Sequence, residues 1–219
     1  MEQICEDLWP GVRRFQVGQR LHTAASNLRH LLAAAAGAGP GLAGEFVAKQ
    51  QGRCRLSRAL VEVDLWRLKE AVAAARAGDQ NPGRRQEALA RACEVYGGPL
   101  ADGCGYGWVG VYREQVRTWA SYAHRELADT TGDPHRAARL LARAAQIDPA
   151  DEDTCRQAMR ACARVGDPAG IRRLLDDLTE HLDTTGGEPG RATVDLAGRL
   201  LHDIGQPPPQ TPDRASPGC

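Results

Sequence analysis

Residues 132–149 read GDPHRAARLLARAAQIDP, and residues 166–183 read GDPAGIRRLLDDLTEHLD. Both stretches begin with the same Gly-Asp-Pro triplet. The leucine pair Leu140-Leu141 recurs as Leu174-Leu175 at the same offset of 34 residues. Apolar residues spaced three and four apart within each stretch are typical of amphipathic helices. The repeat therefore predicts that one helical unit occurs twice.

Each triplet suits the boundary between two helices. Glycine can cap the preceding helix, aspartate can cap the next one, and proline fits a first helical turn. A period of 34 residues is that of tetratricopeptide repeats, each a helix–turn–helix. The first unit also carries Ala137, Leu141, Ala144 and Pro149 in a small–large–small–Pro pattern. A generic array of helical hairpins, with the same architecture, is the alternative.

Helical periodicity extends from this repeat in both directions along the chain. The pattern predicts helices over 64–77, 84–96, 111–131, 134–147, 151–165, 168–184 and about 190–203. Three acidic residues, Asp151, Glu152 and Asp153, fall in the first turn of one of them. Carboxylates at that place complement the helix dipole, so no acid–base site is needed to explain them.

The N-terminal block has a different pattern. A helix is predicted over 16–36, with an apolar face of Leu21, Ala25, Leu28, Leu32 and Ala35. Its other face carries polar side chains, namely Gln19, Thr23, Ser26, Asn27, Arg29 and His30. Two short strands are predicted over 45–49 and 53–57, around a Gln-Gln-Gly turn. A helix followed by a basic hairpin is the order of a winged helix, whose helix enters the major groove.

Positive charge is concentrated in this block, although the whole chain is neutral. Residues 10–58 hold seven Arg and Lys49 against one acidic residue, Glu45. A basic block on a neutral chain is a candidate nucleic-acid footprint, and we expect phosphate contacts from Arg20, Arg29, Arg53 and Arg55. A solvated Arg-rich face is the alternative.

Composition points to an all-α protein. The 219 residues are 42% hydrophobic but only 5% aromatic, which favours closely packed Ala- and Leu-rich helices over a β-sandwich. No apolar run approaches the roughly 18 residues of a membrane span, and no signal peptide is visible. We expect a cytoplasmic protein.

The seven cysteines include no Cys-x-x-Cys pair, and no His stands at a zinc-ligand spacing from two of them. They are expected to be reduced thiols, with no metal site. Cys93, Cys155 and Cys162 fall in helical patterns, where we expect small buried apolar side chains.

Catalytic motifs are almost absent. Residues 105–110, Gly-Tyr-Gly-Trp-Val-Gly, fit G-x-G-x-x-G, but a dinucleotide site needs a preceding strand, and residues 97–103 read as a loop. No other nucleotide, zinc-protease or hydrolase motif occurs, and no His has an obvious nucleophile partner. We therefore expect neither a cofactor nor an enzyme. Residues 205–219 hold five prolines and predict a disordered tail, whose triple proline also suits a partner domain.

In this order, these features resemble the bacterial transcriptional activator domain family, found in actinomycete antibiotic-pathway regulators and in large multidomain regulators. The resemblance covers about residues 1–203. It rests on Leu8-Trp9-Pro10, Asn27-Leu28-Arg29, Arg55-Leu56, Val63-Asp64-Leu65-Trp66, the run Val95-Tyr96-Gly97-Gly98-Pro99-Leu100, Tyr106-x-Trp108, Arg113, Asp148-Pro149-x-x-Glu152 and Gly187-Glu188-Pro189.

The resemblance implies roles for individual residues. Thr23 and Asn27 fall where family members read bases, and Gln19, Ser26 and Arg29 fall where they hold phosphates. Two departures stand out: only about nine residues precede Pro10, and Arg53-Cys54 replaces the family's Gly-Tyr. We therefore expect a truncated or decayed winged helix whose DNA binding is weak or depends on further N-terminal sequence.

The sequence thus predicts a right-handed array of tetratricopeptide-like helical hairpins behind a partial winged helix. The predicted division is 1–58 for the winged-helix remnant, 59–204 for the activator domain and 205–219 for the tail. The predicted function is transcription regulation through contacts with DNA and with a protein partner, either transcription machinery or a second copy. An interaction module without DNA binding is the alternative.

Overall fold

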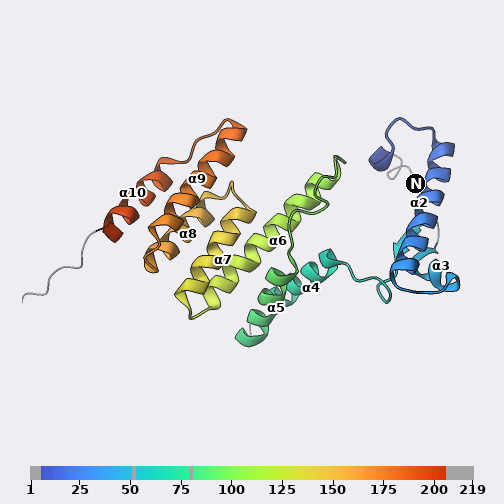
Figure 1. Cartoon of the computed structure of the whole chain (residues 1–219), viewed down its shortest axis with the longest axis horizontal. Coiled ribbons are helices and arrows are strands. Elements are labelled where there is room, and N and C mark those ends of the chain that lie inside the picture. Colours follow the sequence, from blue (N-terminus) through green and yellow to red (C-terminus); the bar gives the residue numbers. More distant parts are fainter. Residues whose placement is uncertain (1–5, 51–52, 79–80, 206–219) are drawn as a thin grey trace, which may run out of the picture. The chain divides into compact units, whose positions relative to one another are not determined.

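The computed structural model describes residues 6–50, 53–78 and 81–205, and most of them are helical (Figure 1). The N-terminal elements are α2 (Arg14–Ala35), η1 (Pro40–Leu42), α3 (Ala43–Phe46), β1 (Val47–Gln50) and β2 (Arg53–Leu56). The later helices are α4 (Asp64–Ala77), α5 (Pro82–Val95), α6 (Val109–Thr130), α7 (Pro134–Ile147), α8 (Glu152–Arg164), α9 (Pro168–Thr185) and α10 (Arg191–Gly205). The all-α prediction is confirmed, with one antiparallel hairpin of β1 and β2.

The chain divides into two compact units. One consists of Met1–Glu70 and Val95–Val116, and the other of Ala71–Glu94 and Arg117–Cys219. The divisions fall within α4, at the end of α5 and within α6, so each of these helices contributes residues to both units. The domain boundaries at residues 58 and 204 stay predictions.

In the second unit, the repeated stretches form two helical hairpins. Figure 1 shows α7 to α10 in succession; α8 packs against α7, α9 and α10, and α9 also packs against α10. Within the triplets, aspartate and proline act as the sequence predicts. Gly166 follows α8 in the left-handed conformation with φ +67°, as a capping glycine does, whereas Gly132 has no positive φ and does not cap α6 in this way. Asp133 accepts a hydrogen bond from the backbone N–H of His135 at 2.9 Å, and Asp167 accepts one from Gly170 at 2.8 Å. Each aspartate thereby caps the helix that begins at the next residue, Pro134 or Pro168.

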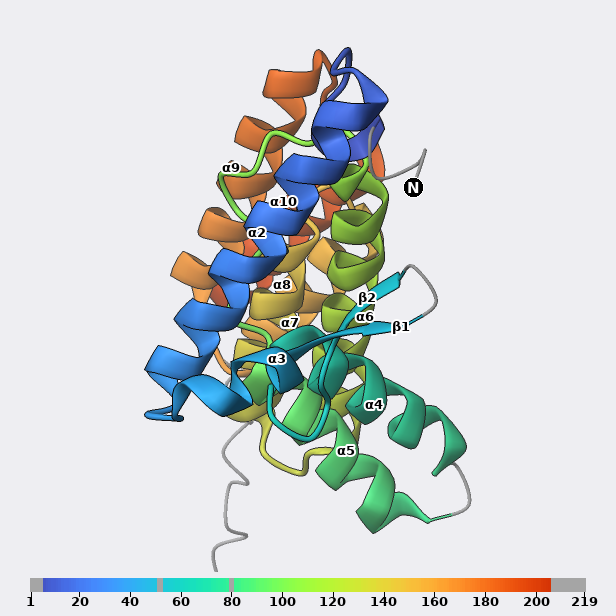
Figure 2. The ribbon, with the colours of Figure 1, turned by 90° about the vertical axis from the view of Figure 1, so that its right-hand side faces the viewer.

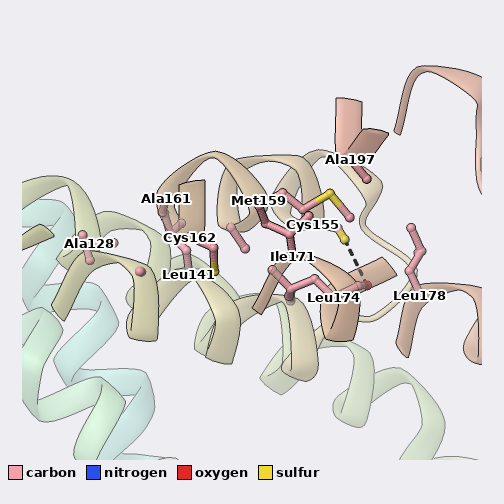
Figure 3. Close-up of a cluster of buried hydrophobic side chains, with 14 residues drawn as sticks. Ala128, Leu141, Cys155, Met159, Ala161, Cys162, Ile171, Leu174, Leu178 and Ala197 are labelled. Carbon is pink, nitrogen blue, oxygen red and sulfur yellow. Dashed lines mark hydrogen bonds between the residues drawn. The ribbon is translucent and has the colours of Figure 1, made fainter. Parts of the chain in front are cut away.

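The core of this unit consists of small and branched side chains from these four helices and the end of α6 (Figure 3). Ala144, Ala158, Met159, Ala161 and Ile171 are completely buried. Small side chains at these positions let neighbouring helices approach closely, and the larger Met159 and Ile171 fill the remaining volume. The aromatic-poor composition is therefore sufficient for a packed core.

In the first unit, a smaller core joins α2 to the hairpin. Ala33 of α2 packs with Phe46 and Val47, and Leu56 of β2 covers the same cluster. Figure 2 shows α2 with α3 and the β1–β2 hairpin near its C-terminal half. This contact fixes the hairpin beside the helix that carries the predicted DNA-contacting residues.

Several predicted bounds need correction. The first predicted strand begins too early: Glu45 and Phe46 belong to α3, and the strand starts at Val47. Val17 and Ala33 are the buried residues of α2, whereas Leu28 and Ala35 of the predicted apolar face are exposed, because α3 and β1 cover only one side of the helix. Gly205 is the last residue of α10, and the remainder of the predicted tail lies outside the described residues.

Candidate nucleic-acid interface

The polar face of α2 is open to solvent. Gln19, Arg20, Thr23 and Asn27 are exposed, and Ser26 is half-buried. Thr23 and Asn27 are four residues apart, so their side chains lie on one face of the helix, one turn from each other. A hydroxyl and an amide in this arrangement can donate to and accept from the edges of adjacent base pairs.

Arg29 has a structural contact in addition to its predicted role. Its Nε donates a hydrogen bond to the carbonyl oxygen of Val47 at 2.9 Å, and the side chain is half-buried. The bond ties α2 to β1 at the point where Ala33 also packs against Val47. Arg29 therefore positions the hairpin, and only its terminal amino groups remain for a phosphate.

The two arginines of β2 lie on one face of the hairpin. Val47 pairs with Leu56, and Ala48 pairs with Arg55 in the antiparallel register. Because side chains alternate along a strand, Arg53 and Arg55 lie on the face opposite to Val47 and Leu56. Both arginines are exposed. The hairpin thus turns two guanidinium groups toward solvent, while Val47 and Leu56 on its other face pack on the core.

Two further basic residues, Lys49 and Arg58, change the prediction of which side chains are available to contact DNA. Lys49 is exposed and pairs with Cys54 in the register, yet only its contribution to the charge block signals it in the sequence. Arg58 is exposed but already has partners on the surface, since its Nη1 contacts Glu70 at 3.0 Å and its guanidinium lies 4.8 Å from the ring centroid of Trp66. The arginine-rich block is therefore only partly a free surface.

Three cysteines of the helices, Cys93, Cys155 and Cys162, are not activated thiols. Burial raises the pKa of Cys93 to about 12 and that of Cys155 to about 11, and it also raises the pKa of Cys162. Cys155 and Cys162 are buried as predicted, whereas Cys93 is only half-buried. At neutral pH these three groups are thiols, which are weak nucleophiles.

The glycine-rich motif at residues 105–110 forms the turn that leads into α6. The described residues 98–103 before it form turns rather than a strand, and α6 begins at Val109. Within residues 6–50, 53–78 and 81–205, no three His, Cys, Asp or Glu side chains gather as metal ligands would. In those same residues, no helix is long and apolar enough to cross a membrane.

Helical hairpins repeating every 34 residues define a tetratricopeptide-like array, and the helix with its basic hairpin precedes that array in the chain. The family model for the bacterial transcriptional activator domain matches residues 63–201. The chain belongs to this family, which confirms the resemblance seen in the sequence, and it is of the transcriptional-regulator type.

A solved structure shares the fold. It is that of Mycobacterium tuberculosis EmbR in complex with a low affinity phosphopeptide, which matches with a TM-score of 0.56 at 23% sequence identity. The match covers 91% of this chain and 54% of the EmbR chain, so this chain spans about half the length of EmbR. No curated protein sequence matches significantly.

Proposed function

We propose that this chain activates transcription, as a regulator or as a module of one, by contacting DNA through α2 and the β1–β2 hairpin and by contacting a protein partner. The single observation that carries the DNA contact is the arrangement in the first unit. The exposed polar face of α2 and the outward arginines of β2 belong to elements joined by the Arg29–Val47 hydrogen bond. No catalytic step is part of this function.

The residues divide into base-reading and phosphate-binding groups. Thr23 and Asn27 read bases, and an asparagine amide can make two hydrogen bonds to adenine. Gln19, Arg20 and Ser26 hold phosphates beside them, as do the terminal amino groups of Arg29. Arg53 and Arg55 contact the backbone from the hairpin. In this proposal, residues 1–58 contact DNA and residues 59–204 form the activator domain.

The protein contact belongs to the helical array, whose partner is transcription machinery or a second copy of the chain. A DNA-bound bacterial regulator works in the cytoplasm, where the chromosome lies. An open groove of about 1120 Å³ in the second unit offers a surface for such a contact. It is lined by Leu141 of α7, Ala163 of α8 and Leu200 and Ile204 of α10, with charged residues at its rim.

Salt dependence of DNA binding tests the proposal. Each neutralised phosphate contributes about −0.9 to the slope of log affinity against log salt. Changing Arg53 and Arg55 together to Gln should therefore flatten the slope by roughly 1.8 units. Fluorescence anisotropy with a labelled duplex, from low to physiological salt, gives this slope.

The matched control changes two exposed arginines of the second unit, Arg172 and Arg199, to Gln. It removes the same charge and should leave the slope unchanged. Equal slopes for both double variants would assign the binding to overall charge and contradict the proposed interface. An absence of binding at low salt would contradict the DNA contact altogether.

An interaction module without DNA binding is the second candidate. The observation in its favour is a pair of exposed apolar side chains one turn apart on α2, Leu28 at 41% and Leu31 at 69% exposure. Neighbouring apolar side chains that are exposed together can mark a protein contact. Under this alternative, Leu31→Ser would weaken partner binding, and the arginine variants would have no effect.

A further inference from the structure

Three exposed aromatic rings form a cluster at the start of α6. Tyr106, Trp108 and Tyr112 are each between 41% and 50% exposed. The rings of Tyr106 and Trp108 are nearly parallel, with an interplanar angle of 21° and centroids 6.3 Å apart. Tyr112 meets Trp108 edge to face at 5.9 Å. We call these three residues the aromatic platform.

The backbone beneath the aromatic platform is held in place by Arg113. Its Nε donates to the carbonyl oxygen of Leu100 at 2.8 Å, and its Nη2 donates to those of Ala101 and Cys104 at 2.5 and 2.7 Å. Val109, between Trp108 and Tyr112, is 2% exposed and anchors the turn from inside. The platform is thus preorganised, which lowers the entropic cost of binding a partner.

The chemistry of the platform excludes some ligands. Residues 103–112 contain no charged residue, in a chain that is 26% charged. Arg113, the basic residue that follows this stretch in the sequence, donates to three backbone carbonyls, so its guanidinium is already engaged and is a poor partner for a phosphate. Binding of nucleic acid by base stacking normally requires such basic groups. The platform therefore fits an uncharged ligand.

The polar atoms of the platform define that ligand further. The indole N–H of Trp108 and the hydroxyls of Tyr106 and Tyr112 make no hydrogen bond to any described residue. A ligand with flat apolar rings and free carbonyl oxygens would satisfy both the ring faces and these donors. A polyproline II helix has this chemistry, because it has no internal hydrogen bonds and presents its carbonyls to the outside.

We propose that the aromatic platform binds a proline-rich segment in polyproline II conformation, supplied by another protein molecule. Such a segment loses little conformational entropy on binding because its helix is preformed. The chain itself contains a sequence of this type, Gln206-Pro207-Pro208-Pro209-Gln210-Thr211-Pro212, which is uncharged like the platform. The platform is a protein-contacting surface in addition to the groove of α7, α8 and α10, and the proposal rests on the protein-binding part of the proposed function.

A labelled peptide with the sequence of residues 206–212 is the probe. Its binding is measured by fluorescence anisotropy to the full chain, with Pro207, Pro208, Pro209 and Pro212 changed to Ala so that the chain's own segment does not compete. We expect saturable binding. A peptide with alanine in place of every proline should bind at least about tenfold more weakly than the proline peptide. The proline peptide should also bind at least about tenfold more weakly to Trp108→Ala than to the parent, since truncated aromatic anchors cost this much at interfaces.

Two further variants separate the roles of the platform. Trp108→Phe keeps an aromatic face without the N–H, and its affinity for the proline peptide should lie between those of the parent and Trp108→Ala. Val111→Ala is the matched control, because Val111 is 76% exposed on the same turn but carries no ring, and it should bind as the parent does. Circular dichroism checks that each variant is folded.

Equal binding of the proline and alanine peptides would overturn the proposal, and so would unchanged binding by Trp108→Ala. A loss of affinity for single-stranded DNA in Trp108→Ala, without any peptide binding, would assign the platform to nucleic acid instead. Because the peptide assay contains no DNA, its outcome is independent of the DNA contact proposed for α2 and the hairpin.

Discussion

The carboxylate of Glu152, in the first turn of α8, caps the start of α10 by accepting hydrogen bonds from the backbone N–H of Gly190. Its two oxygens lie 3.0 and 3.2 Å from that nitrogen. The completely buried Thr193 donates its hydroxyl to the same carboxylate, and Arg156 donates to Thr193 at 2.7 Å. Glu152 therefore links two helices, beyond the effect on its own helix dipole that the sequence suggests.

Glu152→Ala should destabilise the second unit. The change leaves the N–H of Gly190 and the hydroxyl of Thr193 without their acceptor, at a cost of about 1–3 kcal/mol. Asp153→Ala is the control: Asp153 is exposed and its carboxylate pairs with Arg156 at the surface, so its loss should cost under about 1 kcal/mol. Urea unfolding measures both. Equal losses of unfolding free energy in the two variants would show that the link from Glu152 to Gly190 does not stabilise the unit.

Ala144 lies at a helix contact of the repeat and is completely buried. Ala144→Arg should overpack this contact and bury a charge, with a loss of at least ~2 kcal/mol. The stability of Gly107→Ala should be within about 0.5 kcal/mol of that of the parent, because Gly107 is exposed and a Cβ there meets nothing within 4 Å. Thermal melts compare the two. A negligible shift for Ala144→Arg would contradict the packing of the repeat.

Replacing two helical glycines, Gly170 and Gly198, with alanine should change the free energy of unfolding in opposite directions. A Cβ on Gly170 would lie 2.9 Å from the sulfur of Cys162 and closer still to the carboxylate of Asp167, so Gly170→Ala should cost about 1–3 kcal/mol. A Cβ on Gly198 meets nothing within 4 Å, and Gly198→Ala in the exposed face of α10 should stabilise by about 0.5–1 kcal/mol. Stabilisation by both changes would refute the close approach of α9 to α8.

His124 should make stability depend on pH. The imidazole is buried in α6, with Nδ1 2.8 Å from the carbonyl oxygen of Ala120. Burial lowers the pKa of His124 below its usual 6.5, and the positive charge of Arg143 lowers it further. Below pH 6.5 the unfolded chain therefore binds a proton that the folded chain does not, and stability decreases as the pH falls.

The measurement for His124 is the urea midpoint at pH 7.5 and at pH 5.5, for the parent and for His124→Gln. The parent should lose more stability than the variant between the two values, because the variant has no imidazole to protonate. The same loss in both proteins would assign the pH dependence to other groups.

The helices from 64 onward could be predicted from the sequence because local signals agree there. Asp64 and Ala77 bound α4 as predicted, and Pro134 and Ile147 bound α7. Apolar periodicity, caps and proline all act within a few residues, so they need no tertiary information. The predicted bounds are wrong where tertiary packing determines the local structure. Phe46 has the apolar side chain of a strand residue, but it is the last residue of α3, where it packs against Ala33 of α2.

The site could be predicted in part only. The sequence identifies α2 and the charge block, and it places Thr23 and Asn27 on one face. It gives no sign that Arg29 bonds to Val47 or that Arg58 contacts Glu70 and Trp66, because contacts between residues 8 to 18 positions apart depend on how the chain turns between them. The aromatic platform is visible in the sequence as Tyr106-x-Trp108, but its exposure is not.

Thr23 and Asn27 should determine sequence preference without contributing to folding. Both are exposed on α2, and neither belongs to its buried side, so changing both to Ala should leave the fold intact. Losing an asparagine–adenine pair costs about 1–3 kcal/mol of discrimination between bases. Nonspecific affinity should survive, because Arg20, Arg53 and Arg55 remain to bind phosphates.

Selection of bound sequences from a random duplex pool tests this prediction, with the parent and the Thr23→Ala, Asn27→Ala double variant run side by side. The parent should enrich a consensus, and the double variant should bind the pool with similar overall affinity but enrich none. A control pair, Ala24→Ser with His30→Ala, changes exposed neighbours on the same helix and should keep the consensus. If the double variant recovers the parent's consensus, or if the parent enriches none, then α2 does not read bases.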